Sequence, residues 1–169
     1  NLTMAIIENK LKEHNLMGVT RRKVVSYGQY INLGDFRIEF IRTNHSIADS
    51  AALAIYTPAG VIVHTGDFKV DYTPVFGDAI DLQRFAEIGK KGVLALMCDS
   101  TNAERPGFTP SERTLSRIFD TIFHEHPNKR IIIATFASNV DRVQQIINSA
   151  YKYNRKVVVE GRSMVNIID

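Results

Sequence analysis

The chain has 169 residues, enough for one domain or for one domain and part of another, and 44% of them are hydrophobic while 23% are charged. This balance is typical of a soluble globular protein, and no apolar run approaches the roughly 18 residues of a membrane helix. The single cysteine, Cys98, excludes a disulfide framework and favours a cytoplasmic location. A formal charge of +3 is too small to indicate nucleic-acid binding by itself, although it does not oppose a polyanionic substrate.

Both ends of the chain have the pattern of interrupted helices. Met4, Ile7 and Leu11 share one face of a helix that is already under way near the first residue. The chain stops within a second segment of this kind, residues 164–169. We therefore expect an internal fragment of a longer polypeptide.

The first half of the chain predicts strands that end in polar loops. Residues 36–40 alternate apolar and polar side chains, as a half-buried strand does. Residues 51–56 and 61–64 flank a tight turn at residues 57–60, which predicts a hairpin. A further apolar run covers residues 93–97. The loops after these segments contain three side chains suited to chemistry, namely His45, Asp67 and Asp99.

The second half predicts helices alternating with buried strands. Thr109, Pro110 and Glu112 have the spacing of a capping box, which predicts that a helix begins there. Residues 131–135 and 157–159 are short β-branched runs, and between them lies a helical pattern that Ser138 or Asn139 can cap. This order predicts a right-handed parallel crossover, with a domain boundary near residues 107–111.

His45 and Asp67 are candidate ligands of a hydrolytic metal ion, because an imidazole nitrogen and a carboxylate oxygen both suit zinc. Simpler explanations stay open at this point. A single histidine in a loop is more often a hydrogen-bonding residue, Gly66-Asp67 is a common turn, and Asp99 can cap the loop that it begins. His64, at a strand end, is better explained as packed or hydrogen-bonded.

Four sequence motifs together indicate a family resemblance. They are TNHSIADS at residues 43–50, HTGDFK at 64–69, DSTNAERPG at 99–107 and ATFASN at 134–139. Over nearly its whole length the chain resembles the ribonuclease J family, in the β-CASP branch of the metallo-β-lactamase superfamily. The third motif, DSTNAERPG, is the most specific part of the match.

The resemblance implies a fold and a set of site residues. The fold class is α/β, with residues 1–109 as the C-terminal part of the first segment of a metallo-β-lactamase αββα sandwich. Residues 110–169 then start a β-CASP domain with a parallel βαβ arrangement. His45 is implied to bind one of two zinc ions and Asp67 to bridge both. Asp99, the first β-CASP acidic residue, is implied to support a catalytic histidine.

The implied activity is that of a zinc-dependent ribonuclease, cutting RNA phosphodiesters by 5′-to-3′ exonuclease and endonuclease action with a two-metal-activated hydroxide, in RNA processing and decay. Its partner is RNA, with no membrane, and the full-length family members are homodimers or homotetramers. The alternatives are another hydrolase of this fold, either a DNA nuclease or an esterase, and a catalytically inactive RNA-binding module.

The chain also departs from the family pattern. The His-x-His-x-Asp-His metal motif does not occur in these 169 residues, nor do the later β-CASP histidine motifs. His124-Glu125-His126 imitates the first half of that motif, but its position before Pro127 predicts a solvated helix end. We therefore expect the chain to supply one terminal zinc ligand and one bridging ligand, with other ligands lying elsewhere in a longer protein.

Overall fold

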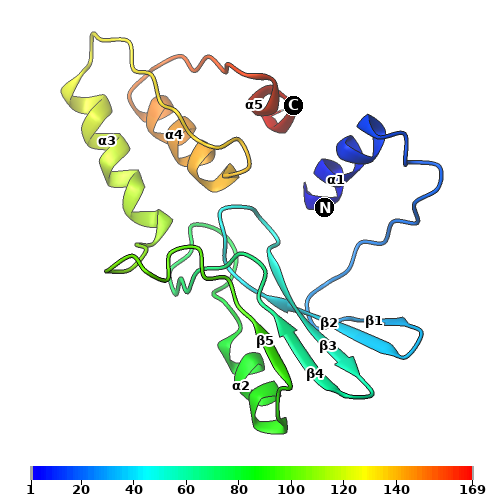
Figure 1. Cartoon of the computed structure of the whole chain (residues 1–169). Helices are drawn as coiled ribbons and strands as arrows, with labels where there is room; N and C mark the ends of the chain where they lie inside the picture. The colour runs from blue at the N-terminus through cyan, green and yellow to red at the C-terminus, as the bar shows by residue number, and fades with distance from the viewer. Residues whose placement is uncertain (1, 169) are drawn as a thin grey trace. The chain divides into compact units, whose positions relative to one another are not determined.

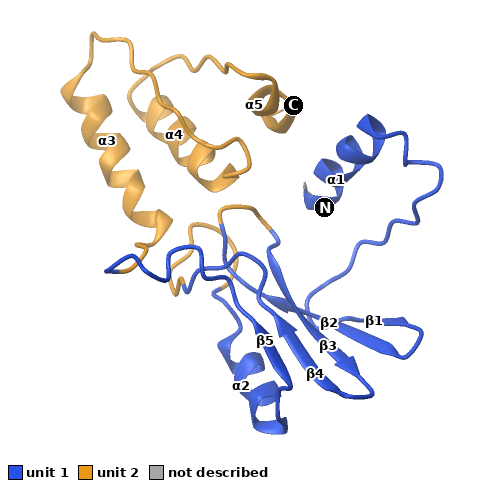
Figure 2. Cartoon of the chain, in the orientation of Figure 1, with its two compact units in different colours: residues 1–45, 49–70, 79–107 blue, residues 46–48, 71–78, 108–169 orange. Residues whose placement is uncertain are grey.

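The computed structural model describes residues 2–168 and divides the chain into two compact units (Figures 1 and 2). Unit 1 contains residues 1–45, 49–70 and 79–107, and unit 2 contains residues 46–48, 71–78 and 108–169. The chain combines helices with a mixed sheet, which confirms the α/β class. None of the helices within residues 2–168 is both long and apolar enough to cross a membrane.

Unit 1 is built on a five-stranded mixed sheet whose strands follow chain order. The strands are β1 (Tyr30–Leu33), β2 (Phe36–Arg42), β3 (Ala51–Thr57), β4 (Gly60–His64) and β5 (Ala95–Met97). The first four pair antiparallel, whereas β5 runs parallel to β4. Two helices complete the unit, α1 (Leu2–Glu13) and α2 (Leu82–Lys91).

The predicted strands at residues 36–40, 51–56 and 61–64 are confirmed, as is the hairpin between the last two. In that turn the Thr57 hydroxyl accepts a hydrogen bond from the amide of Ala59 and donates one to the carbonyl of Gly60. The run at residues 93–97 forms only the short β5, whose side chains are exposed, and Cys98 is exposed just beyond it. β5 is thus an edge strand rather than a buried one.

The core of unit 1 lies on one face of the sheet, where Ile41, Ala52, Ala54 and Val63 pack with Ile88 of α2. The alternation of apolar and polar residues in β2 predicts that its apolar side chains are buried. In the structure, however, Phe36 is 49% exposed, whereas Glu39 is only 2% exposed. The core face of β2 therefore carries a carboxylate. Burial of this charge is possible because a cation from α2 meets it.

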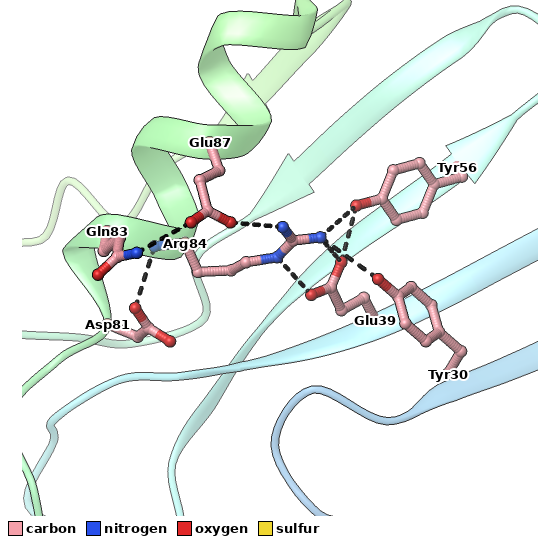
Figure 3. A network of polar contacts seen from close by, with 7 residues as sticks. All are labelled: Tyr30, Glu39, Tyr56, Asp81, Gln83, Arg84 and Glu87. Atoms are coloured by element: carbon pink, nitrogen blue, oxygen red, sulfur yellow. Dashed lines mark hydrogen bonds and ion pairs between the residues drawn. The ribbon is translucent and has the colours of Figure 1, made fainter.

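That cation is Arg84, which fastens α2 to the sheet (Figure 3). Its Nε donates to Glu39 Oε1 at 2.6 Å, and its Nη2 donates to Glu39 Oε2 at 2.9 Å. The hydroxyl of Tyr56 donates to the same carboxylate at 2.7 Å. A bidentate guanidinium–carboxylate pair fixes both position and orientation. At its N-terminus α2 is capped by Asp81, whose side chain accepts from the amide of Arg84.

Unit 2 contains a 3₁₀ turn (Glu112–Thr114) that leads into α3 (Leu115–Glu125), followed by α4 (Val140–Lys152) and α5 (Arg162–Ile168). Phe119 and Phe123 of α3 pack against Ala150 of α4. Polar pairs also join the two helices, since Asp120 accepts hydrogen bonds from Ser149 and from Lys152. As predicted, Asn139 caps α4, accepting from the amide of Arg142.

The predicted start of α3 is wrong. Ser111, not Thr109, is the capping residue, and the α-helix begins only at Leu115 after the 3₁₀ turn. The Ser111 hydroxyl accepts from the amide of Arg113 and donates to the carbonyl of Thr73. The carboxylate of Glu112 accepts hydrogen bonds from Arg142 of α4, so this residue joins the start of α3 to the next helix.

The predicted buried strands at residues 131–135 and 157–159 are not strands in the structure, so the predicted parallel crossover between them is not found. A strand requires a hydrogen-bonded neighbour, and within residues 2–168 no ladder includes either run. Both runs instead line a largely apolar pocket of about 790 Å³ together with α4. The parallel β-α-β unit that the structure contains is β4-α2-β5.

Candidate functional site

Three loops of unit 1 emerge at the same edge of the sheet, after β2, β4 and β5 (Figure 1). The strand register requires this arrangement, because Arg42 pairs with Ala51, Leu53 with His64, and His64 with Met97. The carboxyl ends of these three strands therefore lie together. The loops that follow them contain His45, Asp67 and Asp99 respectively.

His45 lies in the loop after β2 and Asp67 in the loop after β4, and the two side chains face each other. Nε2 of His45 lies 3.8 Å from Oδ2 of Asp67, and the side chains are 35% and 78% exposed. Two donors about 2.1 Å from a tetrahedral zinc ion are separated by about 3.4 Å. The observed spacing is close to this value, and an imidazole with a carboxylate is a chemically suitable donor pair. The pair fits part of a zinc site.

Asp99 begins the third loop and is held at both its backbone and its side chain. Its amide donates to Oγ1 of Thr65 at 2.9 Å. Its carboxylate accepts from the amide and the hydroxyl of Thr101, at 3.0 and 2.6 Å. The Thr101 hydroxyl is the main cause of a lowered pKa for Asp99, and the backbone at Phe68 and the charge of His45 lower it further. Asp99 thus has the loop-capping role that its sequence context allowed, and the same loop lies beside the other two.

Local contacts fix the loop after β2 and tie it to the loop after β4. Thr43 donates its amide to the carbonyl of Ser50, and the two hydroxyls lie 3.1 Å apart. Asn44 and Lys69 form an isolated antiparallel bridge. Gly66 has a φ of +61°, a conformation that residues with a Cβ rarely adopt. The turn that presents Asp67 therefore depends on glycine.

Thr65 and Asn44 are part of this arrangement, although the sequence motifs did not single them out. Thr65 is buried, and its hydroxyl accepts from Asp99 while donating to the carbonyl of Gly66. Asn44 accepts at its side chain from the amide of Ile80. One indication of their importance was present in the sequence: Asn44 directly precedes His45, and Thr65 directly precedes the glycine of the turn before Asp67.

His64 and the segment His124-Glu125-His126 have the roles predicted for them. Nδ1 of His64 accepts a hydrogen bond from the amide of Gly66 at 3.0 Å, so this ring supports the turn before Asp67. His124 lies in the last turn of α3, and His126 is its C-terminal cap. The sequence His124-Glu125-His126 is thus an exposed helix end in unit 2.

Within residues 2–168, no group of three or more histidine, cysteine, aspartate or glutamate side chains is placed to hold a metal ion. His45 and Asp67 are two donors, whereas a catalytic zinc ion usually takes three protein ligands. Further donors are needed to complete a zinc centre here.

Comparisons with known proteins point to one family. The family model for the β-CASP domain of ribonuclease J matches residues 128–169. Ribonuclease J of Synechocystis sp. strain PCC 6803 is 50% identical over 168 residues, which cover 99% of this chain and 26% of that protein. Ribonuclease J of Helicobacter pylori strain J99 is 48% identical over 169 residues, with 99% of this chain and 24% of that protein covered. Ribonuclease J2 of Bacillus subtilis strain 168 is 41% identical, covering 99% of this chain and 30% of that protein.

A solved structure shares the fold. It is the crystal structure of a protein of unknown function from Enterococcus faecalis V583, with a TM-score of 0.57, 23% identity, and coverage of 76% of this chain and 31% of that one. The curated relatives above are each matched over about a quarter to a third of their length. Sequence identity of 41–50% along almost all of the chain places it, together with the β-CASP match, in the ribonuclease J family.

Proposed function

We propose that the chain supplies half of the active centre of a zinc-dependent ribonuclease. The observation that carries the proposal is the convergence of His45 and Asp67, with 3.8 Å between their nearest donor atoms, at the sheet edge where Asp99 also lies. Relatives of 41–50% identity named ribonuclease J or J2 support RNA as the substrate. The remaining ligands would come from other parts of a longer protein.

Each residue has a distinct task in this proposal. His45 would hold one zinc ion, and Asp67 would be a ligand shared with a second. Zinc, when bound, supplies Lewis acidity and lowers the pKa of water. Asp99 stays ionised because its pKa is lowered, chiefly by the Thr101 hydroxyl. It therefore accepts a hydrogen bond from a histidine of the longer protein and fixes the orientation of that ring.

The finer features belong to the same proposal. The mixed sheet of unit 1 with α2 against its core face is one half of a metallo-β-lactamase sandwich, and the β-CASP domain starts at residue 110. The full-length enzyme acts in the cytoplasm on RNA phosphodiesters, as a 5′-to-3′ exonuclease and an endonuclease. It assembles as a homodimer or homotetramer.

A metal-free RNA-binding module is the second candidate. It would share RNA as the ligand but would form no metal centre. The two candidates differ in zinc content, so a measurement of bound metal separates them.

Replacement of Asp67 tests the proposal. In the full-length protein, Asp67→Ala should abolish RNA hydrolysis and lower the zinc content, because the bridging carboxylate is removed. Asp35→Ala is a matched control, since Asp35 lies in the exposed turn between β1 and β2. Unchanged turnover with two zinc ions retained in the Asp67 variant would contradict the assignment.

A further inference from the structure

Two hydrogen bonds of Asn44 point in different directions. Its backbone carbonyl accepts from the amide of Lys69 at 2.8 Å, and its side-chain Oδ1 accepts from the amide of Ile80 at 2.8 Å. Lys69 is two residues beyond Asp67, and Ile80 directly precedes the capping residue of α2. One residue thus ties the His45 loop to the Asp67 loop and to the start of a helix.

The carbonyl bond acts directly on His45. The carbonyl of Asn44 and the amide of His45 belong to the same planar peptide unit. Its hydrogen bond to Lys69 therefore fixes the plane from which the backbone of His45 departs. The same bond fixes the backbone two residues after Asp67, so it relates the two candidate ligands to each other.

The side-chain bond anchors this arrangement to the rigid part of unit 1. Ile80 is buried, and the segment around it is held by Arg42, whose carbonyl accepts from the amide of Asp81 and whose Nε donates to the carbonyl of Ala79. The helix that follows is locked to the sheet through Arg84 and the buried Glu39 (Figure 3). Rotation of Asn44 would break its contact with this framework.

We propose that Asn44 is a positioning residue that sets the spacing of His45 and Asp67 for zinc. The inference rests on the proposed function, because it concerns the same donor pair. In this proposal Asn44 is not a ligand, because each of its two oxygens accepts a hydrogen bond from a backbone amide. It acts by holding two loops at the separation that the ion requires.

The test is the affinity of the full-length protein for zinc alone, measured by competition with a chelator. Asn44→Ala should raise the zinc dissociation constant about 10–100-fold, as loss of residues that orient metal ligands does. Asn139→Ala is the matched control, because Asn139 also accepts one backbone amide through its side chain, but at the start of α4 in unit 2. The control should lose stability and keep its zinc affinity. Asn44→Asp retains the acceptor oxygen and should recover most of the affinity.

The outcomes separate the inference from the proposed function. Wild-type affinity in Asn44→Ala would overturn the inference alone, and so would equal losses of affinity in the Asn44 and Asn139 alanine variants. If the wild-type protein itself binds no zinc, the proposed function fails and the inference fails with it. If the alanine variant does not fold, Asn44→Gln replaces it, because the longer side chain displaces the acceptor. That variant should weaken zinc binding in the same direction, and wild-type affinity in it would overturn the inference.

Discussion

The backbone amide of Asp99 donates a hydrogen bond of 2.9 Å to Oγ1 of Thr65, which joins the loop after β5 to the residue after β4. Thr65 is buried, its hydroxyl donates onward to the carbonyl of Gly66, and its amide donates to the carbonyl of Met97. Two of the three candidate loops are therefore held by a single threonine. The position of Asp99 relative to the turn at Asp67 is set by this side chain.

Replacing Thr65 with valine preserves the shape of the side chain but leaves the amide of Asp99 without its acceptor. This hydrogen bond is partly buried, and a typical intramolecular hydrogen bond contributes about 0.5–1.5 kcal/mol, so we expect the free energy of unfolding of unit 1 to fall by about this amount. Urea denaturation followed by a probe in unit 1 measures the loss. Thr65→Ser keeps the hydroxyl and should lose less, and equal losses in the two variants would contradict this role for the hydroxyl.

Gly66→Ala should disturb the turn that presents Asp67. At a φ of +61° an added Cβ is strained and would lie 3.3 Å from the carbonyl oxygen of Ala51. The left-handed conformation costs roughly 1–2 kcal/mol for a residue with a Cβ. Gly34→Ala is the control, because Gly34 has a φ of +59° with nothing within 4 Å of the added atom. Both variants should lose stability, whereas only the Gly66 variant should lose zinc binding in the full-length protein. Retained zinc binding there would argue against the placement of Asp67.

Arg84→Met should be among the most damaging changes in unit 1. The Glu39 side chain is 3% exposed and would be left as an unpaired charge. Removal of one partner of a buried ion pair costs about 3–5 kcal/mol. Glu87→Gln, which alters the exposed partner of the same arginine, should change stability far less, because water screens this ion pair. Denaturant unfolding of the two variants compares them directly, and similar losses would show that burial of Glu39 is not the decisive factor.

The same carboxylate predicts a loss of stability in acid. Burial by itself raises the pKa of Glu39, but the hydrogen bonds from Arg84 and Tyr56 and the charge of Arg84 outweigh it, so the pKa is lowered from 4.5. A lowered pKa in the folded state means that the stabilisation is complete above the unfolded pKa and is lost as the pH falls through the folded value. Unit 1 should therefore become easier to unfold below about pH 4.5. Unfolding in urea across a pH series measures this slope, and Glu39→Gln should flatten it.

The regular patterns in the sequence predicted much of unit 1. The strands β2, β3 and β4 and the hairpin at residues 57–60 are confirmed, because alternation and turn chemistry are local properties. The face of β2 that enters the core was not predictable in this way. Glu39 is buried only because Arg84 reaches it from a helix 45 residues along the chain. The helix α2 was not predicted, although Leu82, Phe85 and Ile88 recur at helical spacing.

In the candidate site, too, local sequence patterns were predictable and long-range contacts were not. His45, Asp67 and Asp99 were identified from their places after apolar segments, and the structure brings their loops to one sheet edge. Their roles as ligands and support stay predictions. Thr65 and Asn44 were not identified, because their partners Asp99 and Ile80 are 34 and 36 residues away. In unit 2, the runs at residues 131–135 and 157–159 have strand-like composition, but a ladder depends on a neighbour that composition does not specify.

The parallel pairing of β4 with β5 also bears on the order in which the loops assemble during folding. The strands β1 to β4 are joined by short connections, so their pairing closes small loops at little entropic cost. Pairing of β5 must close the segment from residue 65 to residue 94, which includes α2. Contacts of greater sequence separation form more slowly. His45 and Asp67 can therefore come together with the antiparallel meander, and Asp99 arrives last, when α2 docks and completes the sheet.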